Sequence, residues 1–254
     1  MINGMSQLFH EMNLICVPYA GGGPNCFAPL RPYLPAHWKL TELGLPGRGQ
    51  RYHEPVLADA EAMAADIWRQ LAPISSQRYA LLGHSMGSLL AWLVCHRMQE
   101  AGLPMPVHLF LSGREAPSVP HKEPYEHLLP YPDFKAKLEG YGGIAPEITS
   151  DDSIFSFFEP MIRADFRATE TWKYRPFPRL GLPATVFSAS EEEMTEAEVR
   201  AWQQEFEQDA RFVFFEGGHF FLFEQAEAFV RDLLSSLQTA ASNAVSSPAL
   251  FINY

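Results

Sequence analysis

The chain has 254 residues, of which 47% are hydrophobic and 19% charged, so it can bury a full core as one domain. Its formal net charge of -11 at pH 7 repels nucleic-acid phosphates and anionic lipid headgroups, so we expect neither nucleic acid nor a membrane as partner. No apolar stretch reaches the roughly eighteen residues of a membrane span, and no basic start leads into an apolar region, so we expect a cytoplasmic protein.

Short β-rich runs alternate with helical patterns in the first half of the chain. Residues 14–17 read as a strand that opens into three glycines at 21–23. Asp59 is a suitable N-cap for a helix whose apolar residues recur up to Leu71, before Pro73. A buried strand at 79–82 is followed by a helix from Met86, whose apolar residues keep a three-four spacing, and then by a strand at 107–111.

The second half of the chain continues this rhythm. It offers a strand at 184–187, a helix opened by the capping box of Thr195 and Glu198, a strand at 212–215 and a helix over 226–237. An Ala/Ser-rich tail follows at about 239–254, which we expect to fray. The alternation predicts a single α/β domain over residues 1–254, with a mostly parallel sheet and helices on both faces.

The segment from about 117 to 178 breaks the alternation and is rich in proline and aromatic residues. Its best helical stretch, 151–166, places Ile154, Phe155, Phe158 and Met161 on one side. We interpret the segment as an inserted helical cap, and the alternative is extra helical packing on the same core. As a cap, its aromatic residues, Phe155 and Phe158 among them, would form an apolar wall that sets substrate length.

The strongest chemical signal is the run Gly83-His84-Ser85-Met86-Gly87, between a buried strand and a buried helix. A Gly-x-Ser-x-Gly run in that context is the nucleophile elbow of the α/β-hydrolase fold, where a strained turn projects the serine hydroxyl. Ser85 is therefore the predicted nucleophile.

A serine hydroxyl needs a base within hydrogen-bond reach. His219, in Gly217-Gly218-His219, follows the last predicted strand and precedes the last helix, where this fold carries its base. His84, His96 and His108 fit less well, because they lie beside the nucleophile, on a helix and within a strand. We predict His219 as the base.

An oxyanion requires oriented N–H donors. In this fold one is the amide after the nucleophile, here that of Met86, and the other lies in a loop after an early strand, here that of Ala20 in residues 19–23. A phosphate cradle is disfavoured for that loop, because no Gly-Lys-Ser/Thr ending is present.

Several segments together carry a family resemblance. They are Pro18-Tyr19-Ala20-Gly21-Gly22, Leu45-Pro46-Gly47-Arg48-Gly49 with Arg51 and Glu54-Pro55, Gly83 to Gly87, Ser112-Gly113-Arg114, Arg163-Ala164-Asp165-Phe166 and Gly217-Gly218-His219-Phe220-Phe221. On these, nearly the whole chain resembles the type II thioesterases that accompany nonribosomal peptide and polyketide synthases.

The resemblance implies hydrolysis of acyl groups, stalled or mis-primed ones especially, from the phosphopantetheine arm of carrier proteins. It implies no metal and no bound cofactor, since the acyl group arrives on that arm, and we expect a monomer. Two rivals stay open: a general carboxylesterase or acyl-CoA thioesterase with the same catalytic residues, and a non-catalytic binding protein that kept the fold.

The chain departs from the family pattern in its acid. An aspartate is expected in the loop after the 184–187 strand, yet residues 188–195 hold three consecutive glutamates and no aspartate. We expect Glu191 to orient His219, with Glu192 the next choice. Asp165 is a less favoured substitute, because it falls in the predicted cap and its family match reads as structural.

Overall fold

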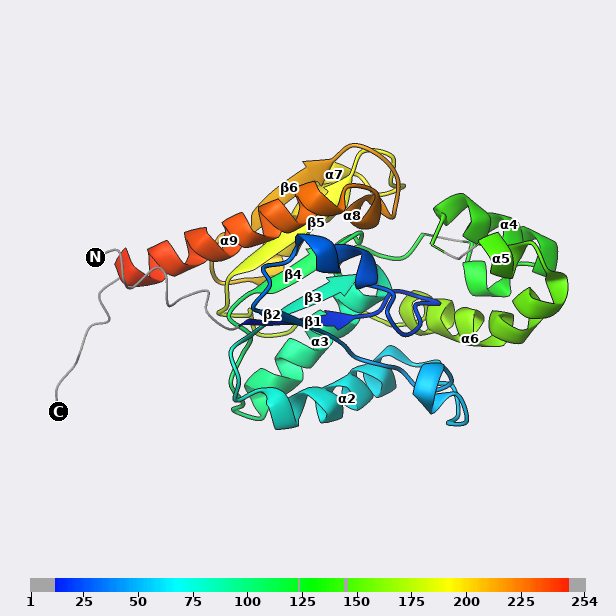
Figure 1. Ribbon diagram of the computed structural model, residues 1–254, viewed down its shortest axis with the longest axis horizontal. Helices are drawn as coiled ribbons and strands as arrows, with labels where there is room; N and C mark the ends of the chain where they lie inside the picture. The colour runs from blue at the N-terminus through cyan, green and yellow to red at the C-terminus, as the bar shows by residue number, and fades with distance from the viewer. Residues whose placement is uncertain (1–11, 123, 144–145, 247–254) are drawn as a thin grey trace.

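Six parallel strands form the centre of the molecule (Figure 1). The computed structural model describes residues 12–122, 124–143 and 146–246. The strand order is β2-β1-β3-β4-β5-β6, and each neighbouring pair is parallel. The strands are β1 (Met12–Val17), β2 (Trp38–Glu42), β3 (Tyr79–His84), β4 (Leu109–Ser112), β5 (Ala184–Ala189) and β6 (Arg211–Phe215). The predicted α/β fold is confirmed, with β2 as an edge strand that the sequence pattern did not reveal.

Helices cover both faces of the sheet (Figure 1). One face carries α2 (Ala60–Leu71) and α3 (Met86–Glu100), and the other carries α9 (Ala226–Ser246) with the 3-10 turn η1 (Ala28–Tyr33). The remaining elements outside the insertion described below are η2 (Gly49–Arg51), η3 (Ala72–Ile74), α7 (Glu196–Arg200), η5 (Ala201–Glu205) and α8 (Phe221–Glu224).

The sequence signals for helix starts correspond to real caps. The Asp59 side chain accepts a hydrogen bond from the Ala62 amide at the start of α2. Thr195 and Glu198 form the predicted capping box of α7.

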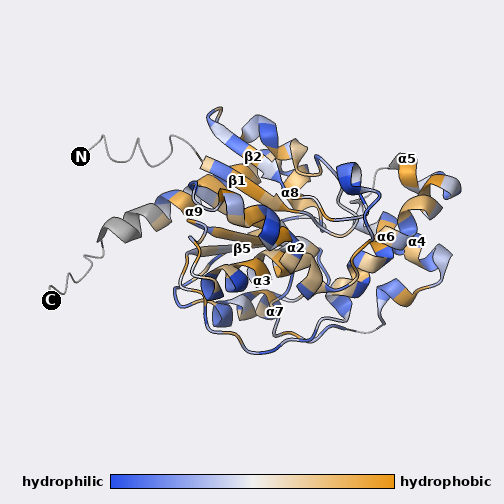
Figure 2. Cartoon of the chain, turned by 90° about the horizontal axis from the view of Figure 1, so that it is seen from below, coloured by the Kyte–Doolittle hydropathy of each residue, from blue (hydrophilic) through white to orange (hydrophobic). Residues whose placement is uncertain are grey.

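The four inner strands β1, β3, β4 and β5 are buried on both faces, which explains their nearly continuous apolar runs. In β1, Ile15 and Val17 join the core under α2 and α3, whereas Leu14 and Cys16 join the core under α9. Figure 2 shows the same arrangement as apolar strands between helices that are polar on the outside.

A helical insertion, residues 113–183, connects β4 to β5. It contains η4 (Glu126–Leu128), α4 (Tyr131–Tyr141), α5 (Pro146–Thr149) and α6 (Asp152–Glu170). These helices stand beyond the carboxyl ends of the strands (Figure 1) and pack around a small core that includes Phe134 and Phe155. The insertion therefore lies at the same edge of the sheet as the loops that carry Ser85 and His219.

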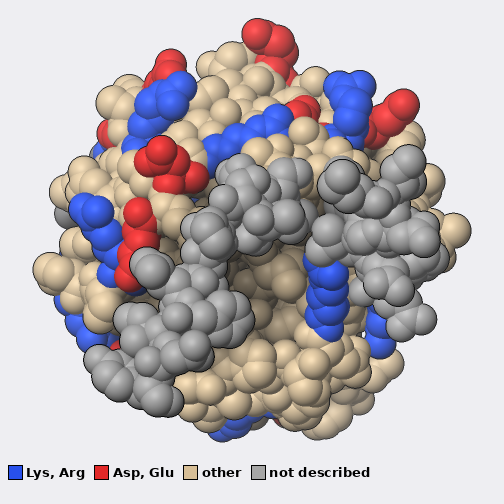
Figure 3. Space-filling view, turned by 90° about the vertical axis from the view of Figure 1, so that its left-hand side faces the viewer, with Lys and Arg blue, Asp and Glu red and all other residues tan. Residues whose placement is uncertain are grey.

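The opposite end of the molecule carries mixed charge. In Figure 3, basic and acidic side chains are interspersed on that face. There α9 continues beyond the predicted end of the last helix, through Ser246, and residues 247–254 of the predicted tail lie outside the described residues. Within the described ranges, no helix has the length and apolar character needed to cross a membrane.

Candidate active site

Ser85 occupies the tight turn between β3 and α3. Its backbone has φ 54° and ψ -118°, a conformation that costs a residue with a side chain roughly 1–3 kcal/mol. The Ser85 amide donates to the carbonyl of Ser112 at the end of β4, at 2.8 Å, and this bond holds the strained turn. The serine hydroxyl is thereby presented at the carboxyl edge of the sheet.

The two glycines of the elbow are required by close backbone contacts. A Cβ on Gly83 would lie 2.1 Å from the carbonyl oxygen of Gly87, and a Cβ on Gly87 would lie 2.2 Å from that of Val17. Any larger residue would force β3, α3 and β1 apart.

His219 is oriented by a carboxylate, and that carboxylate belongs to Glu192. The distance from His219 Nδ1 to Glu192 Oε1 is 2.8 Å. Glu192 is almost completely buried, and its other oxygen accepts hydrogen bonds from the Ser188 hydroxyl and the Ala189 amide, each at 2.9 Å. A carboxylate fixed in this way directs the second ring nitrogen of His219 away from it, toward the cavity.

The preference for Glu191 is therefore corrected to Glu192. The Glu191 amide donates to the Gly217 carbonyl at 3.0 Å, which ties the loop after β5 to the His219 loop, and its side chain is exposed. Glu193 instead forms an ion pair with Lys137 of α4, at 2.7 Å.

Asp165, the least favoured of the candidate acids, lies away from His219. It is fully buried on α6, where it pairs with Arg48 at 2.6 Å and accepts a hydrogen bond from the Gly21 amide at 2.8 Å. Its partners are thus Arg48 in the loop after β2 and Gly21 in the loop after β1, which also contains Ala20.

His84 is a buried neighbour of the base. Its ring lies 4.8 Å from that of His219, centroid to centroid, and its Nδ1 is 3.1 Å from the Ser112 hydroxyl. Burial, with a further contribution from His219, holds the pKa of His84 well below its usual value. A neutral ring packs beside His219 without adding a competing positive charge.

A cavity of about 520 Å³ brings these residues together. Ser85 and His219 line it with Ala20 and Met86, so the predicted nucleophile, base and two amide donors share one space. No hydrogen bond joins Ser85 to His219 in the part of the chain that is described. Catalytic hydrogen bonds commonly tighten only when substrate binds.

The wall contributed by the helical insertion differs from the prediction. Leu138 and Tyr141 of α4 and Phe166 of α6 line the cavity. Phe155 is fully buried between α4 and α6, and the half-buried Phe158 packs on the same cluster; neither lines the cavity. The three-four spacing identified the buried Phe155 and Met161 of α6, whereas Ile154 is exposed, and the buried side packs on α4 rather than on substrate space.

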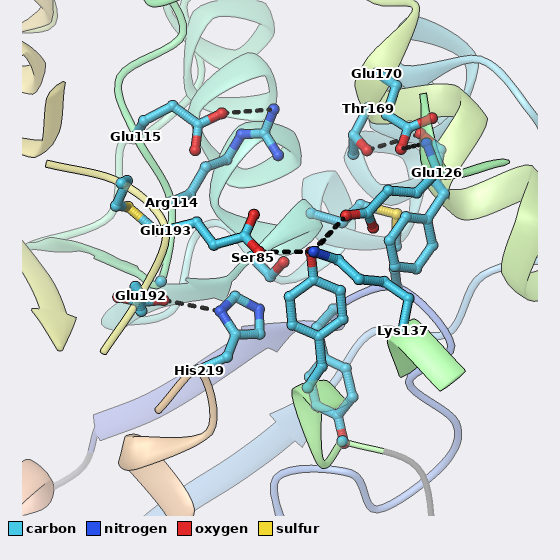
Figure 4. A pocket seen from close by; sticks show the side chains of 18 of the residues that line it. Ser85, Arg114, Glu115, Glu126, Lys137, Thr169, Glu170, Glu192, Glu193 and His219 are labelled. Atoms are coloured by element: carbon cyan, nitrogen blue, oxygen red, sulfur yellow. Dashed lines mark hydrogen bonds and ion pairs between the residues drawn. The ribbon is translucent and has the colours of Figure 1, made fainter. Parts of the chain in front are cut away.

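The charge of Lys137 at the cavity was not predicted from the sequence. The Lys137 ammonium lies between Glu193 and Glu126 (Figure 4), and Arg114 enters from the end of β4. Spacing on α4 places Lys137 one turn before Tyr141, but no sequence signal shows which face of that helix meets the sheet.

The chain matches the family described as "Thioesterase domain" over residues 12–237. It belongs to the thioesterase family. GrsT, a gramicidin S biosynthesis protein of Aneurinibacillus migulanus, is 28% identical to this thioesterase over 229 residues, with 90% of each protein covered.

Solved structures agree with this membership. The RedJ thioesterase of the prodiginine biosynthetic pathway of Streptomyces coelicolor is 32% identical, with a TM-score of 0.80 and 90% of each chain covered. ClbQ, from the colibactin NRPS/PKS pathway, is 26% identical, with a TM-score of 0.84 over 91% of this chain and 98% of its own. The resemblance to type II thioesterases read from the sequence is thus confirmed, and the thioesterase is a hydrolase of thioesters by family.

Among the described residues, no group of three or more His, Cys, Asp or Glu side chains is arranged to hold a metal ion.

Proposed function

We propose that this thioesterase hydrolyses acyl groups from the phosphopantetheine arm of carrier proteins in a nonribosomal peptide or polyketide assembly line, as an editing enzyme. One observation carries the proposed catalytic mechanism: the His219 ring is hydrogen-bonded to the Glu192 carboxylate, and both lie at the sheet edge where the strained Ser85 stands. The gramicidin S, prodiginine and colibactin pathways named for its relatives support the substrate class.

Ser85 acts as the nucleophile, His219 as the base and Glu192 as the acid of a catalytic triad. Buried and held by two donors on its far oxygen, Glu192 cannot turn away from the ring, so it fixes the tautomer of His219 and stabilises the imidazolium. The missing aspartate is the feature that favours a non-catalytic binding protein, and Glu192 supplies a carboxylate in its place.

In acylation, His219 Nε2 takes the proton of Ser85 Oγ as the oxygen attacks the thioester carbonyl carbon. The carbonyl oxygen becomes an oxyanion, which the amides of Met86 and Ala20 stabilise. The tetrahedral adduct then collapses, the C–S bond breaks, and the proton on His219 goes to the leaving pantetheine thiolate.

In deacylation, His219 removes a proton from water, and the resulting hydroxide attacks the acyl-serine carbonyl. The same two amides hold the second oxyanion. Collapse breaks the bond to Ser85 Oγ, which recovers its proton from His219, and the free carboxylic acid leaves.

We further propose that the chain is one hydrolase domain and that the helical insertion serves as its cap. Leu138, Tyr141 and Phe166 would meet the acyl chain, in a cavity that also bears charge from Lys137 and Arg114. Apolar pockets discriminate by only about 1–3 kcal/mol per methylene, so a broad acyl range is expected, as suits an editing enzyme.

Carrier docking would depend on local apolar contact. Carrier proteins are usually acidic, so a chain of net charge -11 gains no long-range attraction from them. Two nearby arginines are already paired, Arg48 in a buried ion pair and Arg51 with Glu54 and Asp66, whereas Arg114 lines the cavity.

Large apolar side chains are exposed on the insertion instead. Phe157 is 75% exposed on α6, and Leu128 is 70% exposed at the end of η4. Replacing Phe157 by serine should raise KM for an acyl-carrier protein and leave KM for the free acyl-pantetheine thioester unchanged. The matched control is Tyr52→Ser, at a residue that is 72% exposed in the η2 region, outside the insertion.

A fluorophosphonate probe tests the nucleophile. It should label the folded wild-type protein at Ser85, as peptide mapping would show, and should not label Ser85→Ala. Absence of labelling in folded wild-type protein would refute the assignment. Faster hydrolysis of oxygen esters than of matched acyl-carrier thioesters would favour the general carboxylesterase instead.

A further inference from the structure

A buried ion pair joins Asp165 of the helical insertion to Arg48 of the loop after β2. Arg48 and Asp165 are 117 positions apart in sequence, yet their side chains form two parallel hydrogen bonds of 2.6 and 2.7 Å. Their exposed fractions are 5% and 0%. The pair therefore lies in a low-dielectric environment, where its geometry is held tightly.

Both members also bind the backbone of residues 19–23. Asp165 Oδ2 accepts from the Gly21 amide at 2.8 Å, and Arg48 Nη1 donates to the Gly22 carbonyl at 3.2 Å. The turn is closed internally by the Gly22 amide, which donates to the Tyr19 carbonyl at 2.9 Å. Ala20 lies inside this turn, and it lines the cavity beside Ser85.

The backbone at this point leaves little freedom. Gly21 has φ 77°, which favours glycine, and a Cβ built on it would lie 3.4 Å from the Ile162 side chain of α6. The turn is thus clamped by α6 through Ile162 and Asp165, and by Arg48 from the loop after β2.

Stability alone gives no reason for charges here. A buried ion pair must offset the desolvation of both groups, and apolar residues of similar size often serve the fold as well or better. Arg48 Nε is, in addition, buried without a hydrogen-bond partner among the described residues. What apolar side chains could not do is accept from the Gly21 amide and donate to the Gly22 carbonyl.

We propose that Asp165 and Arg48 are positioning residues that fix the Ala20 amide at the site of the oxyanion. The inference rests on the proposed assignment of Ala20 to the oxyanion hole. A donor stabilises the oxyanion only if it is oriented before the charge develops. The pair thus acts on the tetrahedral state, and its removal should leave binding of the ground-state substrate nearly unchanged.

The test replaces both charges at once, in the double variant Arg48→Met/Asp165→Leu, so that no lone charge is left buried. Its melting temperature should stay close to that of the wild type, because removal of two desolvated charges offsets the loss of partners for the Gly21 amide and the Gly22 carbonyl. With an acyl-pantetheine thioester, kcat should fall about tenfold to a hundredfold and KM should stay within about twofold, because the donor is displaced rather than deleted. Affinity for an alkyl trifluoromethyl ketone, which forms a tetrahedral adduct with an active serine, should fall by the same factor as kcat/KM.

A conservative variant and a matched control sharpen the result. Arg48→Met/Asp165→Asn restores an acceptor for the Gly21 amide and should recover part of kcat. Arg51→Met/Asp66→Leu removes a nearby ion pair of 2.6 Å that makes no contact with residues 19–23, and should keep the wild-type kcat.

The inference would be overturned by a folded Met/Leu variant that kept the wild-type kcat and ketone affinity. An equal loss of kcat in the Arg51→Met/Asp66→Leu control would also overturn it. So would a Met/Leu variant that melted well below the wild type, because the pair would then serve to stabilise the fold. If wild-type protein itself failed to react at Ser85 with the fluorophosphonate, the proposed active site would fail first. The two failures are therefore distinguishable.

Discussion

Replacing Glu192 by glutamine changes one atom of the triad and is expected to cost most of the activity. The far oxygen of Glu192 faces two donors, the Ser188 hydroxyl and the Ala189 amide. The glutamine carbonyl should occupy that side, because the opposite orientation would set an NH₂ group against the Ala189 N–H. Its NH₂ group would then face His219 Nδ1.

The NH₂ group donates where the carboxylate accepted, so it favours the His219 tautomer that carries its proton on Nε2. That tautomer cannot take the proton of Ser85. Loss of the correct tautomer in a serine protease triad lowers kcat about 10⁴-fold, which corresponds to about 5 kcal/mol in the activation barrier. Because the Ala189 and Ser188 bonds are kept, the free energy of unfolding should change by less than about 1 kcal/mol.

Steady-state hydrolysis of an acyl-pantetheine thioester, followed by trapping of the released thiol, measures the loss, and thermal unfolding checks the fold. Glu191→Gln is the matched control one residue away and should retain near wild-type kcat, since the Glu191 side chain is exposed. A Glu192→Gln enzyme within tenfold of the wild type would refute the triad, and so would a large loss in Glu191→Gln. The first outcome, without the second, would leave a Ser85 and His219 dyad.

Three further outcomes are expected. Tyr141→Ala should shift the chain-length preference measured with a series of acyl thioesters, because Tyr141 lines the cavity. Phe155→Ala should lower the free energy of unfolding by about 3–5 kcal/mol without altering that preference. The reverse pattern would contradict the assigned cavity wall. Added salt should not weaken binding to an acidic carrier protein, as titration at rising ionic strength would show; a marked loss would instead indicate attraction between opposite charges. Burial lowers the pKa of His96 to about 4 and that of His108 to about 3, so both stay neutral in the fold while the unfolded chain takes up protons below about pH 6.5. Each neutral histidine therefore contributes fully to the free energy of unfolding above that pH, and roughly 2 kcal/mol of this contribution is lost when the pH falls to 5. Denaturant unfolding of His96→Gln and His108→Gln should show a smaller drop in the free energy of unfolding between neutral pH and pH 5 than the wild type shows. A drop as large as that of the wild type would contradict this account.

The positions of Ser85 and His219, the proposed nucleophile and base, could be placed from the sequence because each depends on a short local pattern. The elbow glycines at 83 and 87 are required by backbone contacts that leave no room for a Cβ, so the pattern reports the turn directly. His219 follows the last strand of a parallel sheet, and parallel strands bring their carboxyl ends to one edge.

The acid could not be ranked correctly from sequence. Three consecutive glutamates occupy the loop after β5, and the one that meets His219 is decided by how the loop turns. Backbone bonds to Phe215 and Gly217 fix that turn, and Glu192 then reaches back to the amide of Ala189. Such pairings between loops leave no periodic trace.

The cavity wall was misjudged for a related reason. The spacing on α6 identifies a buried side, and Phe155 is buried as its position requires, but the spacing does not show whether a helix or a substrate covers it. The edge strand β2 was missed because its residues alternate between buried and exposed without a long apolar run.

The central claim is that this chain removes acyl groups from carrier proteins through Ser85. The most direct measurement follows an acyl-phosphopantetheinyl carrier protein by intact-protein mass spectrometry with catalytic amounts of enzyme. The account predicts loss of the acyl mass and retention of the phosphopantetheine arm with wild-type enzyme, and an unchanged acyl carrier with Ser85→Ala. An acyl carrier left intact by wild-type enzyme, or equally deacylated by Ser85→Ala, would contradict it.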